Sequence, residues 1–559
     1  MDGGADASVD VTIVSFRFDP DGEGFYRMPW PSDARLTADG TPDLSDFPRR
    51  GPPTESPLSL VESDVRGFST MPVVYLPMGN GIAEGSIPSG TDAMRDDSPI
   101  QLVDLSEDAC GTRLPIEARF DAGGTPLRDD NVLRVANAIG TVLTPGHPYG
   151  LLVLDTLGEA EGRSTPRPDA FDAALRDEAE TDAISRSLAP LRRCAPDAGV
   201  PLERIAVATV FTPHDPAEDM QRLRDFVMDP SLETRPLRDW DRSDALSRRR
   251  LDLETHTAIV EMPVFQEGET PYTTSGGNIV FEDGDPVLQR WEDVAMVVAY
   301  GRLADPPSGP RPVLVFQDGT GWSPWTHLNR GWINEAIDAG YVVVSFMPQF
   351  HGGRAGFEGN TELTTFNLPN PPAGRSNFRQ QAAETSFMVR VIREQLDGLD
   401  GLPELDLSHL VYGGHSQGAL VGAIVAGVET EYDAYALNGL SSFLTLTILH
   451  RKDIIDFAVV VSTSYGFLGE LDRFSLLLQM IQMGGDAVDP HNYATRWRGW
   501  TENPSGNHVF VINGREDTTT TPRGIEHLTM VADMPPTAPA GWDVDPAGVW
   551  DGEAVALPA

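Results

Sequence analysis

The second half of the chain alternates short apolar runs with longer stretches whose apolar residues recur at helical spacing. Val313–Phe316 and Tyr341–Phe346 are short and almost entirely apolar, which is typical of strands buried on both faces. Residues 328–337 and 377–396 instead place apolar side chains on one face of a helix. Because strand and helix alternate, the pattern predicts a mostly parallel sheet with helices on both faces.

The first half has a different pattern, in which turn residues separate short apolar segments between positions 71 and 211. Repeated short strands of this kind predict a β-rich antiparallel sandwich. Thr144 to Leu154 resembles a strand pair of immunoglobulin-like domains in bacterial surface proteins, and residues 168–191 predict a helical insertion. The strands that we expect are Val73–Leu76, Ile100–Val103, Leu133–Val135, Leu151–Leu154 and Ile205–Phe211.

The length of the chain, 559 residues, is too great for a single hydrophobic core. We expect a flexible acidic tail over residues 1–24, the immunoglobulin-like domain over 25–225 and the sheet-and-helix domain over 226–559.

Charge excludes one class of partner. The chain has 42 basic and 84 acidic residues, a formal net charge of −42. Nucleic-acid binding requires basic stripes that neutralise phosphates, so we exclude it, and anionic membranes are repelled as well. The sequence has no apolar run long enough to predict a membrane-spanning helix.

The N-terminus and the cysteines bear on the compartment. MDGGADASVD is small and acidic, which is typical of the tether that follows a removed export signal in a bacterial surface lipoprotein. A cytoplasmic N-terminus can have the same composition. Cys110 and Cys194 are either one disulfide or two free thiols. We therefore expect an extracellular or cell-surface protein, with peripheral tethering to the membrane, and leave the cytoplasmic alternative open.

One stretch carries most of the chemistry. Leu410–Tyr412 has strand character, Gly414-His415-Ser416-Gln417-Gly418 follows it, and small and aliphatic residues then continue to Gly427. A Gly-x-Ser-x-Gly turn between a strand and a helix holds its serine in a strained conformation with the hydroxyl above the sheet. The alternative is a glycine-rich turn with an incidental serine. We interpret Ser416 as a nucleophile.

Two further motifs give the second half a resemblance to a known fold. Gln317-Asp318-Gly319-Thr320-Gly321 follows one predicted strand, and His351-Gly352-Gly353-Arg354 follows the next. With the serine turn, they make residues 255–530 resemble an α/β-hydrolase. Together with the first half, the chain is similar to large secreted bacterial lipases and esterases that have an N-terminal immunoglobulin-like domain.

The resemblance implies how an oxyanion would be held. In this fold the amide after the nucleophile, here that of Gln417, acts with an amide of the loop after the third strand, here that of Thr320 or Gly319. The family usually has histidine where this chain has Asp318. A carboxylate beside an oxyanion is unfavourable, so we expect Asp318 to turn away and bond to its own loop.

The resemblance also implies an acid and a base. Asp517 follows the predicted strand His508–Asn513 and is our candidate for the acid that orients a histidine, although it can instead cap the next helix. His527 is the only histidine after it, and it lies in the predicted helix, whereas the family places the base beyond one more strand. His527 in an unusual arrangement, a histidine beyond Ala559, His327 or His351 as a substitute, and an inactive site all remain open.

The substrate pocket is the least specific prediction. Residues 444–500 are more apolar than a surface requires, and in lipases a cap or lid occupies this position. Trp322 and Trp325 are candidates for an acyl pocket. Buried helix packing explains the same apolar residues.

These features predict a serine carboxyl-ester hydrolase, an esterase or lipase that acts through an acyl-enzyme. It would require no metal or organic cofactor, and its partner would be a small-molecule or lipid ester. The alternatives are a catalytically inactive surface binding protein with the same fold, or a peptidase or acyltransferase. The sequence does not determine the oligomeric state.

Overall fold

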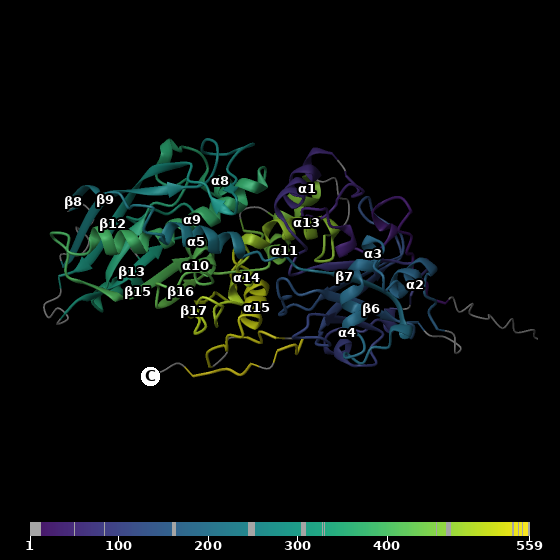
Figure 1. Cartoon of the computed structure of the whole chain (residues 1–559). Coiled ribbons are helices and arrows are strands. Elements are labelled where there is room, and N and C mark those ends of the chain that lie inside the picture. Colours follow the sequence, from purple (N-terminus) through teal and green to yellow (C-terminus); the bar gives the residue numbers. More distant parts are fainter. Residues whose placement is uncertain are drawn as a thin grey trace, which may run out of the picture. The chain divides into compact units, whose positions relative to one another are not determined.

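The computed structural model describes residues 13–49, 51–82, 84–158, 164–243, 252–302, 309–326, 328, 330–453, 456–464, 471–538, 542–545, 547–550 and 552–556 (Figure 1). The chain forms two compact units. The first contains residues 1–215, 459–483 and 545–551, and the second contains 216–458, 484–544 and 552–559. The first division thus falls at 215/216, ten residues before the predicted 225/226.

The first unit is built on two antiparallel sheets. One has the strand order β1-β5-β4 and the other β3-β2-β6-β7. Each predicted strand of the first half lies within an observed one, while the immunoglobulin-like assignment stays a prediction. The bounds are β1 Val73–Pro77, β2 Ile100–Asp104, β3 Arg113–Leu114, β4 Ile116–Asp121, β5 Val132–Asn137, β6 Tyr149–Leu154 and β7 Ile205–Phe211.

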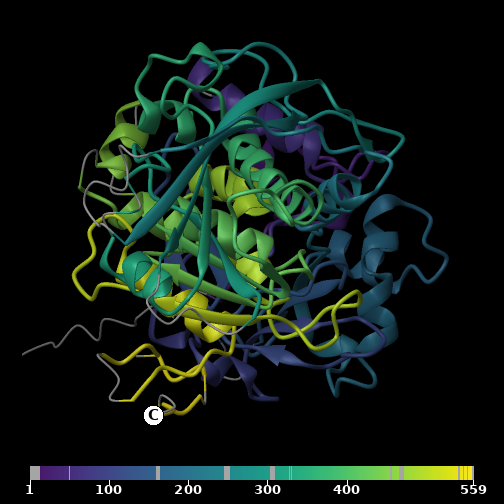
Figure 2. The same cartoon turned by 90° about the vertical axis from the view of Figure 1, so that its left-hand side faces the viewer.

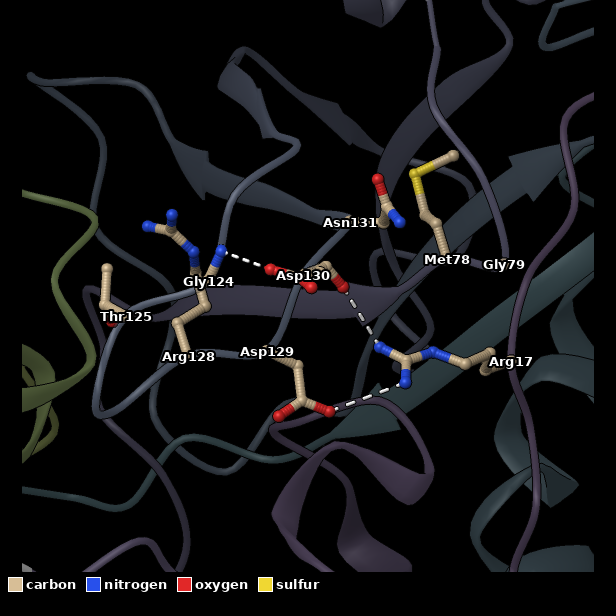
Figure 3. A pocket seen from close by; sticks show the side chains of 9 residues that line it. All are labelled: Arg17, Met78, Gly79, Gly124, Thr125, Arg128, Asp129, Asp130 and Asn131. Carbon is tan, nitrogen blue, oxygen red and sulfur yellow. Dashed lines mark hydrogen bonds and ion pairs between the residues drawn. The ribbon is translucent and has the colours of Figure 1, made fainter.

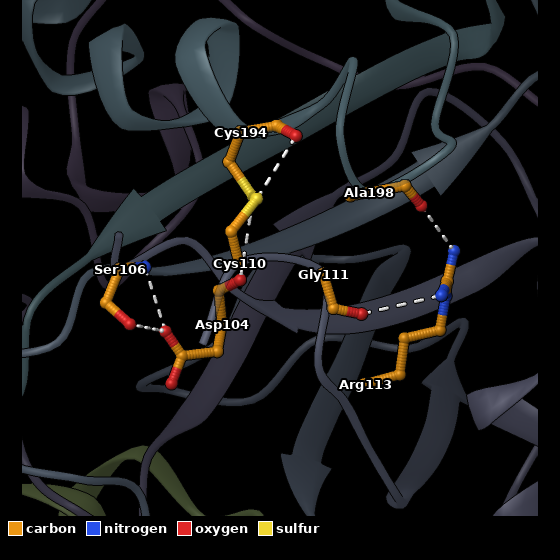
Figure 4. The surroundings of a disulfide bond; sticks show 7 residues. All are labelled: Asp104, Ser106, Cys110, Gly111, Arg113, Cys194 and Ala198. Carbon is orange, nitrogen blue, oxygen red and sulfur yellow. Dashed lines mark hydrogen bonds between the residues drawn. A yellow bond between two sulfur atoms is a disulfide. The ribbon is translucent and has the colours of Figure 1, made fainter. Parts of the chain in front are cut away.

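A disulfide joins Cys110, in the turn after β2, to Cys194, the last residue of the short helix α4 (Figure 4). Their Cα atoms are 5.7 Å apart, within the usual range for a disulfide. Of the two alternatives for these cysteines, the structure has the disulfide. The predicted helical insertion consists of α2 Asp169–Arg176, α3 Ala183–Ser187 and α4 Ala189–Cys194.

Part of the predicted cap belongs to the first unit. Residues 459–483 fall in this unit although they are flanked in sequence by the second. Leu476, Met480 and Met483 are buried in the first unit's core, and the Tyr75 hydroxyl donates to the Phe474 carbonyl at 3.0 Å. Core packing thus accounts for the buried apolar residues of this part of 444–500, whereas Val459 and Val460 are exposed. The helices here are α12 Phe457–Ser464 and α13 Leu476–Gly485.

The second unit contains an eight-stranded sheet with the order β17-β16-β15-β13-β14-β12-β9-β8. β14, β13, β15, β16 and β17 are parallel, and β12, β9 and β8 continue the sheet in antiparallel pairing. The strands twist relative to one another, which is visible for the teal strands in Figure 2. The bounds are β8 Arg238–Arg242, β9 Leu253–Val264, β12 Arg290–Gly301, β13 Arg311–Gln317, β14 Val342–Phe346, β15 Leu405–His415, β16 Ala434–Asn438 and β17 His508–Ile512.

Both faces of this sheet are covered. Along β13, Val313 and Val315 enter a core that includes residues of α9 and α10, whereas Leu314 and Phe316 enter a second core with residues of α7. This alternation follows from the two-residue period of a strand, so the mostly parallel sheet with helices on both faces is confirmed. The helices are α5 Glu218–Met228, α7 Gly331–Asp338, α8 Thr361–Phe366, α9 Pro371–Val391, α10 Gln417–Val425, α11 Leu444–His450, α14 Pro490–Ala494 and α15 Pro522–Val531.

The sheet ends at β17. After α15, the described residues between 532 and 556 add no strand beside it. This is where the resemblance would have a further strand, followed by the base. Among the described residues, no helix is long and apolar enough to span a membrane.

Candidate active site

Ser416 lies between β15 and α10 with φ 52° and ψ −114°. A positive φ is strained for a residue with a Cβ, and such strain is typical of functional sites. A Cβ on Gly414 would lie 2.4 Å from the Gly418 carbonyl oxygen, and one on Gly418 would lie 2.1 Å from that of Gln317. The turn can therefore be this tight only with glycine on both sides of the serine.

Ser416 lines a cavity of about 290 Å³ in the second unit. Gly319, Thr320, Trp322 and His415 line it as well. One part of the remaining wall is apolar and includes Phe366, Phe378, Leu420, Leu444, Val488 and Pro490. Another part is polar and includes Glu362, Arg451, Asp453, Asp489, Thr447, Thr519 and Thr520.

The loop after β13 lies directly against Ser416, since a Cβ on Gly319 would be 3.5 Å from Ser416 Oγ. The Gly319 amide donates to Asp318 Oδ1 at 2.8 Å, and the Gly321 amide donates to His351 Nε2 at 2.9 Å. These bonds occupy two of the loop's donors. Of the two predicted loop donors, the hydrogen bonding favours the amide of Thr320 over that of Gly319.

Asp318 forms an ion pair at the base of this loop. Arg330 donates to its two carboxylate oxygens at 2.8 and 3.2 Å, and the guanidinium lies over the Trp322 ring, 4.3 Å from its centroid. Asp318 is buried. Its charge is balanced by Arg330 and by the Gly319 amide of its own loop, which is the orientation expected for it.

His351 supports the loop. Its Nδ1 is 2.7 Å from the Gln349 carbonyl oxygen, so this nitrogen donates and Nε2 is the acceptor for the Gly321 amide. Burial lowers the pKa of His351, with the Gln349 hydrogen bond acting in the opposite sense and Arg354 adding to the lowering. The neutral form that the loop requires is therefore favoured. His327, the other substitute base considered, lies outside the described residues.

The predicted acid, Asp517, binds its own loop. Oδ1 accepts the amides of Thr519 and Thr520 at 2.8 and 2.9 Å, and Oδ2 accepts the Thr520 hydroxyl at 2.8 Å. Thr519 and Thr520 line the cavity, whereas Asp517 is not among its lining residues. In this conformation Asp517 orders the loop that precedes α15.

The predicted base, His527, is fully buried within α15. Its ring centroid is 5.1 Å from the rings of both Phe443 and His491. Among the described residues that line the cavity, His415 is the only histidine, and its Nδ1 is 2.6 Å from Asn438 Oδ1. The structure thus brings Ser416, Gly319 and Thr320 together at the cavity, and it places Asp517 and His527 outside the cavity lining.

The two tryptophans assigned to an acyl pocket differ. Trp322 lines the cavity, whereas Trp325 is not among its lining residues and packs partly buried against the core of the sheet. Of the two predicted pocket residues, only Trp322 therefore lines the cavity.

The charged part of the wall was not predicted from the sequence. Arg451 donates to Glu362 at 2.6 Å and to Asp453 at 2.9 Å, and its side chain is buried. Two carboxylates on one guanidinium leave this wall with net negative charge. The signal in the sequence was an arginine next to acidic residues in an otherwise apolar segment, but its partner Glu362 is 89 positions away.

The first unit has a cavity of its own, of about 450 Å³, with polar lining (Figure 3). Arg17 crosses it to form an ion pair with Asp129 at 3.5 Å, and both side chains are exposed. Among the described residues, neither this cavity nor any other place holds three or more histidine, cysteine or acidic side chains arranged for a metal ion.

The strand order and the serine turn at the carboxyl end of β15 decide the architecture. The chain has an α/β-hydrolase fold. Its solved structural neighbours include acetyl xylan esterase 1 from Thermoanaerobacterium sp., with 15% identity, coverage of 62% of this chain and 88% of that chain, and a TM-score of 0.37. An acetyl xylan esterase from Paenibacillus sp. has 12% identity, coverage of 61% and 85%, and a TM-score of 0.36.

A peptidase is among the neighbours as well. The acylaminoacyl peptidase of Pyrococcus horikoshii has 11% identity, coverage of 50% of this chain and 41% of that chain, and a TM-score of 0.28. No family model matches the chain, and no curated protein matches it. Likeness at this distance concerns the fold and carries no information about the substrate.

Proposed function

We propose that the protein is a serine carboxyl-ester hydrolase that acts through an acyl-enzyme. The observation that carries the proposal is the strained Ser416, which lines a cavity together with Thr320 and is followed directly by Gln417, the first residue of α10. Strain of this kind persists only where the surrounding structure enforces it, and here glycines and a hydrogen-bonded loop do so.

In the proposed reaction, Ser416 Oγ forms a bond to the ester carbonyl carbon as its proton passes to a histidine nitrogen. The carbonyl electron pair moves onto oxygen, where the amides of Thr320 and Gln417 donate to it. Collapse of the tetrahedral intermediate expels the alcohol, which takes the proton from the histidine. Water then attacks the acyl-enzyme carbonyl and gives a proton to the histidine. The second collapse releases the carboxylic acid, and Ser416 Oγ regains its proton from the histidine. Asp517 and His527 are the candidates for acid and base by chain order.

The cavity favours neutral esters. Its apolar wall suits a short or medium acyl chain, while Glu362 and Asp453 outnumber Arg451 on the charged wall. An anionic group would therefore meet net negative charge there, in a protein of net charge −42. Faster turnover of anionic vesicles than of neutral esters would contradict this preference.

A fluorophosphonate probe tests the proposal, because it labels only an activated serine. We expect labelling of the wild-type protein and none of Ser416→Ala, together with loss of hydrolysis of acetyl to octanoyl nitrophenyl esters. A folded wild-type protein that is not labelled, or a Ser416→Ala variant that hydrolyses these esters at the wild-type rate, refutes the proposal.

A second candidate is a binding protein that has the hydrolase fold without the reaction. The observation in its favour is that His415, the histidine of the cavity lining, is engaged with Asn438. Here a neutral ester would raise the melting temperature without being cleaved, and Ser416 would not be labelled. Cleavage of the stabilising ester would exclude this candidate.

We further propose that the protein is exported and tethered at the cell surface of a bacterium. The disulfide between Cys110 and Cys194 supports this, since such bonds persist in oxidising compartments. Alkylation of intact cells followed by mass spectrometry tests it. Two alkylated cysteines in the native protein would contradict export.

A further inference from the structure

A chain of buried side-chain hydrogen bonds lies behind the cavity. The Thr320 hydroxyl donates to Gln417 Oε1 at 2.8 Å, and Gln417 Nε2 donates to Gln381 Oε1 at 2.8 Å. Gln381 Nε2 then donates to Gln317 Oε1 at 3.5 Å, a longer and weaker contact. The three glutamines are each 3% exposed or less. Buried amides of this kind are costly unless their partners are kept.

The hydrogen bonds run in one direction through the four side chains. Because Gln417 Oε1 accepts the Thr320 hydroxyl, the amide nitrogen of Gln417 faces Gln381. Gln381 must then present its oxygen to Gln417, which turns its nitrogen toward Gln317. Each side chain fixes the orientation of the next.

These hydrogen bonds, together with the backbone from Gln317 to Thr320, form a closed ring. Gln317 ends β13, Thr320 is three residues further along the same loop, Gln417 begins α10 and Gln381 lies on α9. Thr320 and Gln417 are the two residues whose backbone amides would hold the oxyanion. Their separation is therefore set by their own side chains and by Gln381, which does not line the cavity.

We propose that Gln381 is a positioning residue of the oxyanion hole. The inference rests on the proposed hydrolase function and adds a residue to it that touches no substrate. Without Gln381, the Gln417 side chain loses the acceptor that holds it against Thr320, and the two amides lose their fixed spacing. Misplacement of catalytic groups by about 1 Å can cost on the order of 100-fold in rate.

The neighbouring residue of Gln381 on α9, Gln380, provides a control. Gln380 is fully buried on the same helix, accepts the Phe265 amide at 2.9 Å, and donates to the Pro263 carbonyl at 2.8 Å and to Glu384 Oε1 at 3.0 Å. Methionine at either position keeps the approximate volume and removes buried side-chain hydrogen bonds, two at Gln381 and three at Gln380, so the control is at least as disruptive to packing. A merely structural role for Gln381 would make the two variants alike.

The experiment compares Gln381→Met and Gln380→Met for melting temperature, fluorophosphonate labelling rate, kcat and KM. We expect both to lower the melting temperature. Only Gln381→Met should lower kcat and the labelling rate, by about 10- to 100-fold with KM nearly unchanged. Equal kcat losses in the two variants, or wild-type kcat in Gln381→Met, overturn the inference.

Thr320→Val supplies a second, independent measurement, because it removes the other bond to Gln417. If both bonds hold one geometry, the losses in the Thr320→Val/Gln381→Met double variant should be smaller than the product of the single losses. Losses that multiply would show two independent effects and overturn the inference. A folded wild-type protein without labelling would instead refute the proposed function itself.

Discussion

Gly418→Ala tests whether the serine turn depends on the close approach of α10 to β13. An added Cβ would lie 2.1 Å from the Gln317 carbonyl oxygen and 2.7 Å from its carbonyl carbon. Both are backbone atoms, which cannot rotate away as a side-chain end can. Relaxing such a contact to ordinary van der Waals distance requires α10 and β13 to separate by roughly 1 Å.

Two effects oppose each other at Gly418. Alanine is favoured over glycine in a helix by about 1 kcal/mol, whereas overpacking a core costs about 1–3 kcal/mol and occasionally more. The clash is severe and involves rigid atoms, so we expect destabilisation. The same shift moves the Thr320 and Gln417 amides apart, and labelling of Ser416 should slow by on the order of 100-fold.

The assay compares Gly418→Ala with Gly331→Ala in thermal melting and in fluorophosphonate labelling. Gly331 likewise lies in the first turn of a helix, α7, and among the described residues an added Cβ there meets no atom within 4 Å beyond its own helix and its chain neighbours. Gly331→Ala should melt at the wild-type temperature or above it and label normally. If Gly418→Ala also melted and labelled like the wild type, the packing argument would be wrong.

Three further predictions concern single interactions. Arg330→Met leaves the buried Asp318 carboxylate without its ion pair, so stability should fall by about 3 kcal/mol, and Asp318→Asn in the same protein should recover much of the loss in melting temperature. Burial lowers the pKa of His351, so between that pKa and its ordinary value of about 6.5 the unfolded chain binds the proton that the folded protein excludes. The His351 contribution to stability is therefore complete above pH ~6.5 and lost as the pH falls toward the folded pKa; melting curves of His351→Gln should lack this slope, and an unchanged slope would contradict the assignment. Cys110→Ser/Cys194→Ser opens a loop of 84 residues, which corresponds to about 4.6 kcal/mol of chain entropy, and should lower the melting temperature of the first unit to the value that the wild type has in reductant.

Local patterns predicted much of the fold because they need no distant partner. The run Val313–Phe316 became the centre of β13, and Gly414 to Gly418 formed the strained turn, since strand character and turn chemistry are encoded by neighbouring residues. Asn278–Phe281 shows the limit. Its apolar residues predict a strand, yet the segment forms only an isolated bridge from Ile279 to Gln266 and the start of the short hairpin strand β10 Phe281–Glu282, because nothing local fixes how far a ladder continues.

Helix α9 shows what a periodic pattern cannot tell. The expected helix 377–396 exists and begins earlier, at Pro371, with proline in its first turn where no amide partner is needed. It looked amphipathic, yet its polar residues are buried along with its apolar ones. Partners from distant segments satisfy them, such as Arg354 for Glu384, and those segments are not evident from the helix itself.

The sequence by itself determined the glycine-flanked serine turn and the alternating strands and helices of the sheet, because both arise from contacts within a few residues. Only the tertiary structure decided that residues 459–483 pack in the first unit, that Cys110 meets Cys194, and that Gln381 stands behind the oxyanion loop. It also placed Asp517 and His527 outside the lining of the cavity that holds Ser416. These outcomes depend on which distant segments come together, and a spacing along the chain does not encode that.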